Sequence, residues 1–221
     1  MKQIKAVLLM SESHAAAART FAQNAGIDLE AAVVDNLAAL RHACTASTDL
    51  LLSFGTGVIV PQSILTLPKL MALNIHGASA DFPGRDPHHF AHYSGAKKYG
   101  ATLHFIRERV DSGPIVDMEL FDVPDGATPA ILLAAANRAG IELMRRLFAT
   151  HASNGWPHID QSLHWGLHKS TRRDFLELCR VRCDMDEGEF LRRLAATSMP
   201  GYSNLYIDLH GYRFRLEGKA K

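Results

Sequence analysis

The first half of the chain alternates short apolar runs with Ala-rich or amphipathic stretches. The apolar runs at residues 4–10, 31–34 and 49–54 are typical of strands that are buried on both faces of a sheet. Between them, residues 15–25 and 36–44 carry the spacing of apolar side chains that predicts helices. Strand, helix, strand, helix, strand is the order found in a doubly wound, mostly parallel α/β sheet, and this is the fold class that we predict.

The middle of the chain adds three strands and one long helix to this pattern. Apolar residues mark expected strands at residues 71–76, 101–106 and 115–121. A helix is expected to begin after Thr128, because an N-cap threonine followed by proline favours a helix start, and to run to about residue 150.

Past the long helix, the composition becomes richer in His and Arg. The pattern there predicts a helix at residues 186–197 and a β-hairpin at residues 204–216, with His210-Gly211 at its turn. We therefore expect two parts, a main α/β domain at residues 1–155 and a small helix-and-hairpin appendage at residues 156–221.

Composition and charge narrow the class of protein. The 221 residues are 47% hydrophobic and 21% charged, with a formal net charge of +1, as in ordinary globular proteins. A charge this close to zero argues against an extensive nucleic-acid-binding surface. Three cysteines without a CxxC motif favour a reducing compartment. The apolar run at residues 4–10 is too short for a signal peptide or a membrane span, so we expect a cytoplasmic protein without a membrane partner.

Candidate chemistry gathers where the predicted strands end. Asn74 and His76 lie two residues apart, so on a strand their side chains leave the same face. Asp111 lies in a separate turn, from which its carboxylate could orient His76, while Asn74 could donate a hydrogen bond to an oxyanion. Taken alone, an Asn-x-His pair at a strand end is also explained by structural hydrogen bonding, so these residues do not decide between the two interpretations.

Four successive motifs resemble those of the folate-dependent formyltransferases. They are Leu73-Asn74-Ile75-His76-Gly77, Pro83-Gly84-Arg85, Gly100-Ala101-Thr102-Leu103-His104 and Asp111-Ser112-Gly113-Pro114-Ile115. The family includes glycinamide ribonucleotide formyltransferase, methionyl-tRNA formyltransferase and sugar N-formyltransferases. The resemblance implies transfer of a formyl group from N10-formyltetrahydrofolate to an amine, with Asn74, His76 and Asp111 as catalytic residues and with no metal.

The resemblance also implies where the formyl donor binds. In the family the folate slot is built from the loop after the third strand and from the loop that carries the catalytic aspartate. The corresponding residues are Phe54, Gly57, Val58, Ile59, Arg107, Arg109 and Val110. His104 is expected to brace the Asp111 loop, with simple core packing left equally open.

Departures from the family pattern bear on the amine acceptor. Ser11-Glu12-Ser13-His14 replaces the Gly-rich, phosphate-binding turn of purine-pathway members, which disfavours glycinamide ribonucleotide. The loop at residues 78–83 is shorter than in a typical member. Residues 194–216, with Met199-Pro200-Gly201-Tyr202, resemble the end of sugar N-formyltransferases. We therefore expect a small-molecule acceptor, a nucleotide-linked amino sugar. The alternatives are another small amine (ornithine-like or glycinamide ribonucleotide-like), hydrolysis of the formyl folate, and a folate or nucleotide sensor without turnover.

Other clusters have structural interpretations that we prefer. His88 and His92 could hold zinc at helical spacing, but no third ligand is evident, and a helix at the rim of the acceptor cleft is expected instead. Cys179 and Cys183 are expected to pack or to lie exposed. The arginines of residues 172–182 alternate with acidic residues, which is typical of a solvated helical face. Aromatic residues gather in the last third of the chain and leave a homodimer open.

Overall fold

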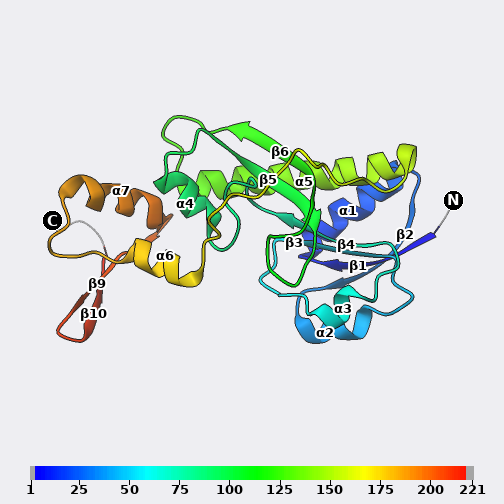
Figure 1. The fold of residues 1–221 in the computed structure, drawn as a ribbon, viewed down its shortest axis with the longest axis horizontal. Helices are drawn as coiled ribbons and strands as arrows, with labels where there is room; N and C mark the ends of the chain where they lie inside the picture. The colour runs from blue at the N-terminus through cyan, green and yellow to red at the C-terminus, as the bar shows by residue number, and fades with distance from the viewer. Residues whose placement is uncertain (1–2, 218–221) are drawn as a thin grey trace.

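The computed structural model describes residues 3–217 and contains a twisted six-stranded sheet (Figure 1). The strand order is β2-β1-β3-β4-β5-β6, in which the pairs among β1, β2, β3 and β4 are parallel and those of β4 with β5 and β5 with β6 are antiparallel. The strands are β1 (Gln3–Leu9), β2 (Asp28–Val34), β3 (Leu50–Phe54), β4 (Met71–His76), β5 (Lys98–Phe105) and β6 (Ile115–Asp122). The predicted mostly parallel sheet is confirmed.

Helices cover both faces of the sheet, as the doubly wound prediction requires. On one face α1 and the long α5 lie side by side, and on the other lie α2 and the short α3 (Figure 1). The helices are α1 (Glu12–Asn24), α2 (Leu37–Ala43), α3 (Gln62–Leu65), α4 (Pro87–Tyr93), α5 (Pro129–Asn154), α6 (Arg172–Cys179) and α7 (Glu187–Thr197).

Two buried apolar cores, one on each face, hold these layers together, and a third core, which includes Tyr99 and Leu132, packs α4 against β5 and α5. Leu8, Leu52 and Leu73 point toward α1 and α5, while Leu9 and Leu51 point toward α2 and α3. Burying one such side chain contributes roughly 1.5–3 kcal/mol, so the central strands are the most strongly fixed part of the fold. Positions at the carboxyl ends of these strands are therefore rigid.

The C-terminal elements lie together at one end of the molecule, beyond α4 (Figure 1). They comprise α6, α7 and the short strands β7 (Ser198–Met199), β8 (Tyr202–Ser203), β9 (Tyr206–Leu209) and β10 (Tyr212–Arg215). β9 and β10 form the expected hairpin. His210 (φ +50°) and Gly211 (φ +84°) make its two-residue turn, because two consecutive positive φ angles match the twist of a hairpin.

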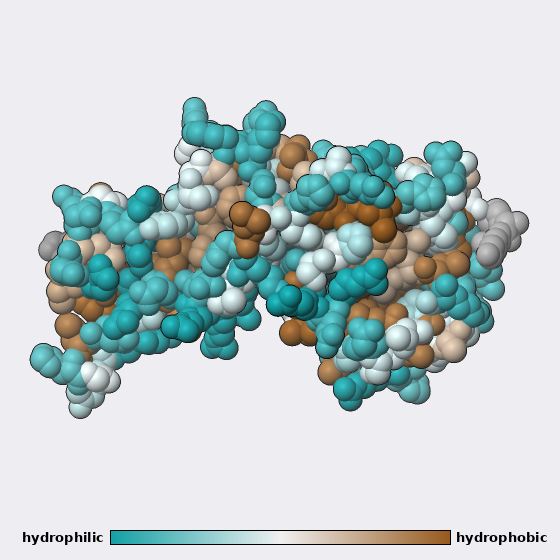
Figure 2. All heavy atoms as spheres, viewed as in Figure 1, coloured by the Kyte–Doolittle hydropathy of each residue, from teal (hydrophilic) through white to brown (hydrophobic). Residues whose placement is uncertain are grey.

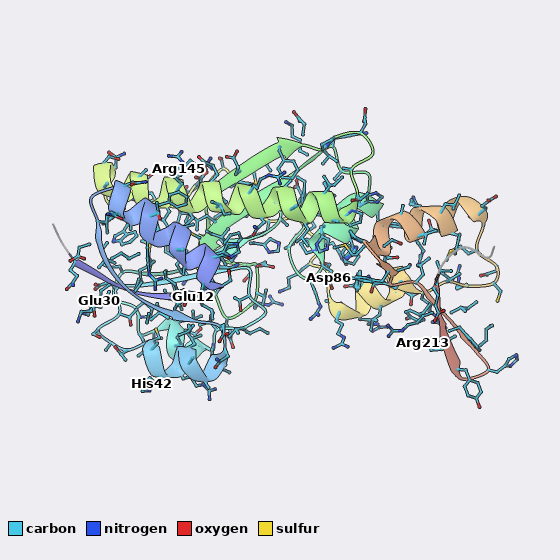
Figure 3. All side chains as sticks on the ribbon, turned by 180° about the vertical axis from the view of Figure 1, so that it is seen from behind. Glu12, Glu30, His42, Asp86, Arg145 and Arg213 are labelled. Atoms are coloured by element: carbon cyan, nitrogen blue, oxygen red, sulfur yellow. The ribbon has the colours of Figure 1, made fainter. Side chains whose placement is uncertain are left out.

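The surface of this end carries apolar side chains among hydrophilic ones (Figure 2). Tyr212 and Phe214 of the hairpin are 71% and 55% exposed. Asp86 lies where the α/β part and the C-terminal elements meet, whereas Arg213 lies out on the hairpin (Figure 3). Among the residues described, none of the helices has the length and apolar character needed to cross a membrane.

Candidate active site

The polar side chains of β4 and β5 meet across a pair of antiparallel strands. Asn74 lies directly opposite His104 in the strand register, and His76 lies two residues further along β4 on the same face. The Asn74 Nδ2 donates a hydrogen bond of 3.0 Å to His104 Nε2. The pairing of β4 with β5 is therefore enough to bring the Asn74 and His104 side chains together, and no loop is needed to position them.

Asp111 reaches the two imidazoles from the turn between β5 and β6. Its carboxylate is buried, with Oδ2 3.5 Å from His76 Nδ1 and Oδ1 3.5 Å from His104 Nε2. The backbone N–H of Gly84 donates to Asp111 Oδ2 at 2.8 Å. Asp111 itself has a φ of +45°, which aspartate tolerates better than most residues. The predicted trio of Asn74, His76 and Asp111 is thus brought together, with His104 as a fourth member.

Gly113 makes this turn possible. A Cβ atom at Gly113 would lie 1.8 Å from the carbonyl oxygen of Phe105, so only glycine allows the two backbone segments to approach this closely. The turn is closed by a hydrogen bond of 3.0 Å from the Phe105 N–H to the Pro114 carbonyl. The Asp111-Ser112-Gly113-Pro114 motif therefore builds the turn that delivers the carboxylate.

The hydrogen bonds fix which nitrogen of each imidazole carries a proton. His104 Nδ1–H donates to the Phe105 carbonyl at 2.9 Å, which leaves Nε2 of the neutral ring to accept from Asn74. His76 Nε2–H donates to the Phe82 carbonyl at 3.0 Å, so the lone pair of neutral His76 is on Nδ1 and faces Asp111. His76 Nδ1 is therefore the nitrogen of this pair that is free to exchange a proton.

Burial and charge act against each other in this group. Burial lowers the pKa of His76, although the charge of Asp111 and the bond to the Phe82 carbonyl act in the opposite direction. Burial would raise the pKa of Asp111, but contact with His104, the nearby His76 and the Gly84 N–H outweigh it and hold that pKa below the ordinary value. The Asp111 carboxylate is therefore held in its ionised form, while burial favours the neutral form of His76.

These side chains form the floor of a cavity of about 460 Å³ at the carboxyl ends of β3 and β4. Ligands bind at this edge of an open α/β sheet, and the volume is within the range of small-molecule sites. Of the residues expected to bind the donor, five line the cavity: Gly57, Val58, Ile59, Arg107 and Val110. Three cations lie in its wall, namely Arg85, Arg107 and Lys169.

Two residues expected to bind the donor do not line this cavity. Phe54 is only 2% exposed and lies in the apolar core, where its ring packs so closely on Gly140 that a Cβ there would lie 2.4 Å from it. Phe54 is the last residue of β3 and faces α5, so its side chain points away from the loop that follows. Arg109 lies in the turn before Asp111 but outside the lining.

Sequence reasoning missed the part of the site that comes from the C-terminal third of the chain. Lys169 and Ser170 line the cavity, although they are distant in sequence from the motifs. Ser170 pairs with Gly84 in a parallel β-bridge, and its hydroxyl donates to the Arg85 carbonyl at 2.7 Å. No motif marks these residues, since backbone pairing alone brings them to the site.

The histidine cluster of α4 lies on a helix that begins at Pro87, as expected, and one of its members is buried. His89 is 4% exposed, donates from Nδ1 to the Ala196 carbonyl at 2.6 Å and contacts the Phe175 ring at a centroid distance of 4.8 Å. Because α7 packs on α4 and Phe175 of α6 contacts His89, this helix anchors the C-terminal elements, while His88 and His92 stay partly exposed. Across residues 3–217, no three or more His, Cys, Asp or Glu side chains are grouped to hold a metal ion.

Comparison with known proteins places the chain in a family. A model of the formyl transferase family matches residues 2–146. The chain belongs to the formyl transferase family. Methionyl-tRNA formyltransferase of Leptospira interrogans is 28% identical over 117 residues, which are 52% of this chain and 37% of that protein. The chain thus spans little more than a third of the length of this curated relative.

Solved structures match over much more of the chain. A sugar N-formyltransferase from a Shewanella species superposes with a TM-score of 0.76 at 16% identity, covering 99% of this chain and 98% of that one. HypX from Aquifex aeolicus in complex with tetrahydrofolic acid superposes with a TM-score of 0.63 at 16% identity, covering 96% of this chain and 36% of that one. At these identities, the likeness is one of fold.

The family match includes four side chains of the site and ends before the rest. Asn74, His76, His104 and Asp111 all lie within residues 2–146, whereas Lys169 and Ser170 lie outside. Lys169 and Ser170 therefore form a part of the cavity wall that comes from the C-terminal region, outside the family match.

Proposed function

We propose that the chain transfers a formyl group from N10-formyltetrahydrofolate to a primary amine. The observation that carries this proposal is the meeting of the Asn74 amide, the His76 and His104 imidazoles and the Asp111 carboxylate in the lining of one cavity, in a chain of the formyl transferase family. This set offers a hydrogen-bond donor, a base and an ionised partner for that base, which acyl transfer to an amine requires.

The cavity suits the flat ring system of the donor. The side chains of Val58, Ile59, Ile106 and Val110 provide apolar walls, and the backbone around Gly57 is open, since a Cβ there would meet nothing within 4 Å. Ile59 and Val110 are 65% and 44% exposed, so burying them against a ring would be favourable. We therefore place the donor between the loop after β3 and the turn after β5.

The donor supplies a formyl carbon, to which the acceptor nitrogen forms a bond while the bond from that carbon to the folate nitrogen breaks. Asn74 Nδ2 has one N–H bonded to His104 and a second that can donate to the formyl oxygen as negative charge develops there. His104 keeps the amide in this orientation, because its own Nδ1–H is fixed on the Phe105 carbonyl.

His76 and Asp111 move the proton that the acceptor nitrogen loses. Neutral His76 has its lone pair on Nδ1 and can accept this proton, and Asp111 at 3.5 Å stabilises the imidazolium that results. The same proton then returns to the folate nitrogen as it leaves, so that the reaction consumes no net proton. The depressed pKa of His76 keeps it neutral and able to act as a base near pH 7.

For the acceptor we propose a nucleotide-linked amino sugar. The Shewanella structure that is named a sugar N-formyltransferase matches this chain from end to end, including the C-terminal elements. Arg85, Arg107 and Lys169 in the cavity wall suit the phosphates of such a substrate, since guanidinium and ammonium groups bind phosphate oxygens strongly.

The test is replacement of the two residues assigned to proton transfer. We expect His76→Ala and Asp111→Ala each to abolish transfer, measured by mass spectrometry as the loss of the added formyl group on the amine. His42→Ala, which removes an exposed histidine on α2 (Figure 3), is the matched control and should keep full activity. Unchanged turnover in both site variants would contradict the proposal, as would donor binding without transfer to any amine or to water.

A further inference from the structure

A segment between α5 and α6 crosses the sheet edge next to the site. We refer to residues 157–171 as the strap. Its backbone bonds to three separate places: Asp160 N–H donates to the Ile115 carbonyl at 2.9 Å, Gly166 N–H to the Ala80 carbonyl at 2.8 Å, and Ser170 N–H to the Pro83 carbonyl at 2.9 Å. The strap is therefore pinned to β6 and to the loop that follows β4.

Trp165 lies in the middle of the strap and contacts both imidazoles of the site. Its ring is edge-on to His104, with a centroid distance of 4.9 Å and an interplanar angle of 87°, and edge-on to His76 at 5.9 Å and 62°. Aromatic pairs prefer such edge-to-face arrangements at these distances. One indole thus limits the rotation of both rings.

The same indole also holds the turn that carries Asp111. Trp165 Nε1–H donates to the Gly113 carbonyl at 2.8 Å. The neighbouring Gly166 allows the indole to take this position, because a Cβ atom at Gly166 would lie 2.5 Å from the Asp81 carbonyl oxygen. Three groups that come from β4, β5 and the turn are therefore linked through a single side chain.

Trp165 differs from an ordinary core residue. Within residues 3–217, the three apolar cores and the side chains packed on them do not include it. It is partly exposed, and its ring contacts the rings of His76 and His104. The second tryptophan, Trp156, stacks on His151 at 4.0 Å and packs against the main core, so it provides a contrast on the same chain.

We propose that Trp165 is a positioning residue, which keeps His76, His104 and Asp111 in their mutual arrangement and makes the strap part of the active site. The kinetic test of this inference rests on the proposed function, because it measures formyl transfer. The carboxylate lies 3.5 Å from each imidazole, so small ring rotations would separate the groups. Without the indole, each ring would keep one hydrogen bond to a backbone carbonyl and lose its lateral support.

The first test is spectroscopic and needs no substrate. In a Trp156→Phe background, Trp165 is the sole tryptophan, and a protonated imidazole in ring contact quenches indole emission. We expect the emission to fall on acidification with a midpoint below pH 6.5, within the range where circular dichroism shows an unchanged fold. The charged or titratable groups at this ring contact are His76, His104 and Asp111, and the strap itself adds the exposed His164 and His168.

Variants of these histidines assign the transition. Replacing His76 and His104 together by Asn should remove it, whereas His164→Asn and His168→Asn should leave it in place. A transition that survives the loss of both site histidines, or that vanishes with His164→Asn, would show that the indole does not contact the site, and would overturn the proposal.

The second test separates positioning from binding. We expect Trp165→Leu to lower kcat about 10- to 100-fold with little change in KM, because small misplacements of catalytic groups cost this much. Trp165→Phe keeps a ring but loses the bond to Gly113, so its kcat should fall about fivefold, the value of one neutral hydrogen bond. Trp156→Phe should match the unaltered protein. Unchanged kcat in Trp165→Leu, or a change in KM alone, would contradict positioning.

The two tests distinguish this inference from the proposed function. If the unaltered protein transfers no formyl group to any amine, the proposed function fails, while the emission titration still reports whether Trp165 contacts the two imidazoles. If transfer occurs and Trp165→Leu has normal kinetics, the proposed function stands and the role of Trp165 is refuted.

Discussion

At the scale of single residues, the site depends on the pairing of two strands more than on any loop. Asn74 and His104 are cross-strand partners, and side chains at such positions lie about 4.5–5.5 Å apart at Cβ. A shift of β5 by one residue against β4 would turn His104 to the face of α5 and leave Asn74 without its partner. The polar site is therefore specified by the same register that buries Leu73 and Leu103 on the other face.

The structure gives His104 a specific role, because its ring accepts a hydrogen bond from the Asn74 amide. We expect His104→Ala to lower kcat by about 10-fold or more, because Asn74 loses the acceptor that orients its amide. The fold should be retained, and thermal unfolding would check this. A normal kcat in His104→Ala would show that the Asn74 amide needs no support from β5.

The titration of His76 is the second prediction at this scale. Burial depresses its pKa and Asp111 partly restores it, so an NMR titration of the His76 ring should show a midpoint below pH 6.5. In Asp111→Asn the midpoint should fall further, because the restoring charge is gone. A midpoint that rises in Asp111→Asn would contradict the assigned electrostatics.

At the scale of elements, the turn between β5 and β6 depends on a close approach that a substitution would disturb. We expect Gly113→Ala to lower the free energy of unfolding and to displace Asp111, because its Cβ would collide with the Phe105 carbonyl oxygen. Gly57→Ala is the control on stability, since its Cβ would meet nothing. Chemical denaturation would measure both. Equal unfolding free energies for the two variants would show that the turn adjusts at no cost.

The packing of α4 on the C-terminal helices makes stability depend on pH. Burial and the nearby His89 lower the pKa of His88 to about 4, and burial also lowers the pKa values of His89 and His92. Neutral histidines are thus favoured in the fold. Their stabilising effect is complete above about pH 6.5, the unfolded value, and is lost as the pH falls toward about 4.

Urea denaturation at pH 7.5 and pH 5 tests this dependence. The denaturation midpoint should be lower at pH 5, and His88→Gln should reduce the difference between the two values. The exposed His42 serves again as control, because His42→Gln should leave the difference unchanged. A midpoint that is the same at both pH values in the unaltered protein would contradict the lowered pKa values.

The elements that could be predicted from the sequence are those with a clear apolar periodicity or a characteristic turn. The strands of the main sheet, the long helix and the hairpin at His210-Gly211 follow from such local signals. Helix α1 begins three residues earlier than the Ala-rich stretch, because the Ser11 side chain accepts from the N–H of His14. A helical face was expected among residues 172–182, but the bounds of helix α6 were not predicted. Its capping box at Thr171 and Asp174 is a local signal that could have shown it.

At the scale of the whole molecule, contacts between distant segments explain what remained unpredicted. Asn74, His76 and Asp111 could be predicted because they lie in motifs within one unit of the sheet. Trp165, Lys169 and Ser170 could not, since their place at the site results from backbone bonds between the strap and residues 80–85. The division of the chain at residue 155 stays a prediction, but the cavity wall has contributions from both sides of it.

The bridge between Gly84 and Ser170 joins the strap to the α/β part, and it gives a prediction for the molecule as a whole. A Cβ at Gly84 would lie 2.2 Å from the Ser170 carbonyl oxygen, and Gly84 has a φ of +100°. Gly84→Ala should therefore push the strap away from the site. Hydrogen exchange of the amides in the strap should increase, while exchange in β1 and β3 stays slow.

A matched control separates this effect from backbone strain alone. Gly126 also has a positive φ, of +71°, but a Cβ there would meet nothing within 4 Å, and it lies in the turn before α5, away from the strap. Gly126→Ala should therefore strain the backbone at its positive φ but leave the hydrogen bonds of the strap unchanged. Because the strap supplies Lys169 and Trp165, Gly84→Ala should also weaken transfer more than Gly126→Ala does. Equal exchange rates in the strap of both variants would mean that the bridge does not hold the two parts together.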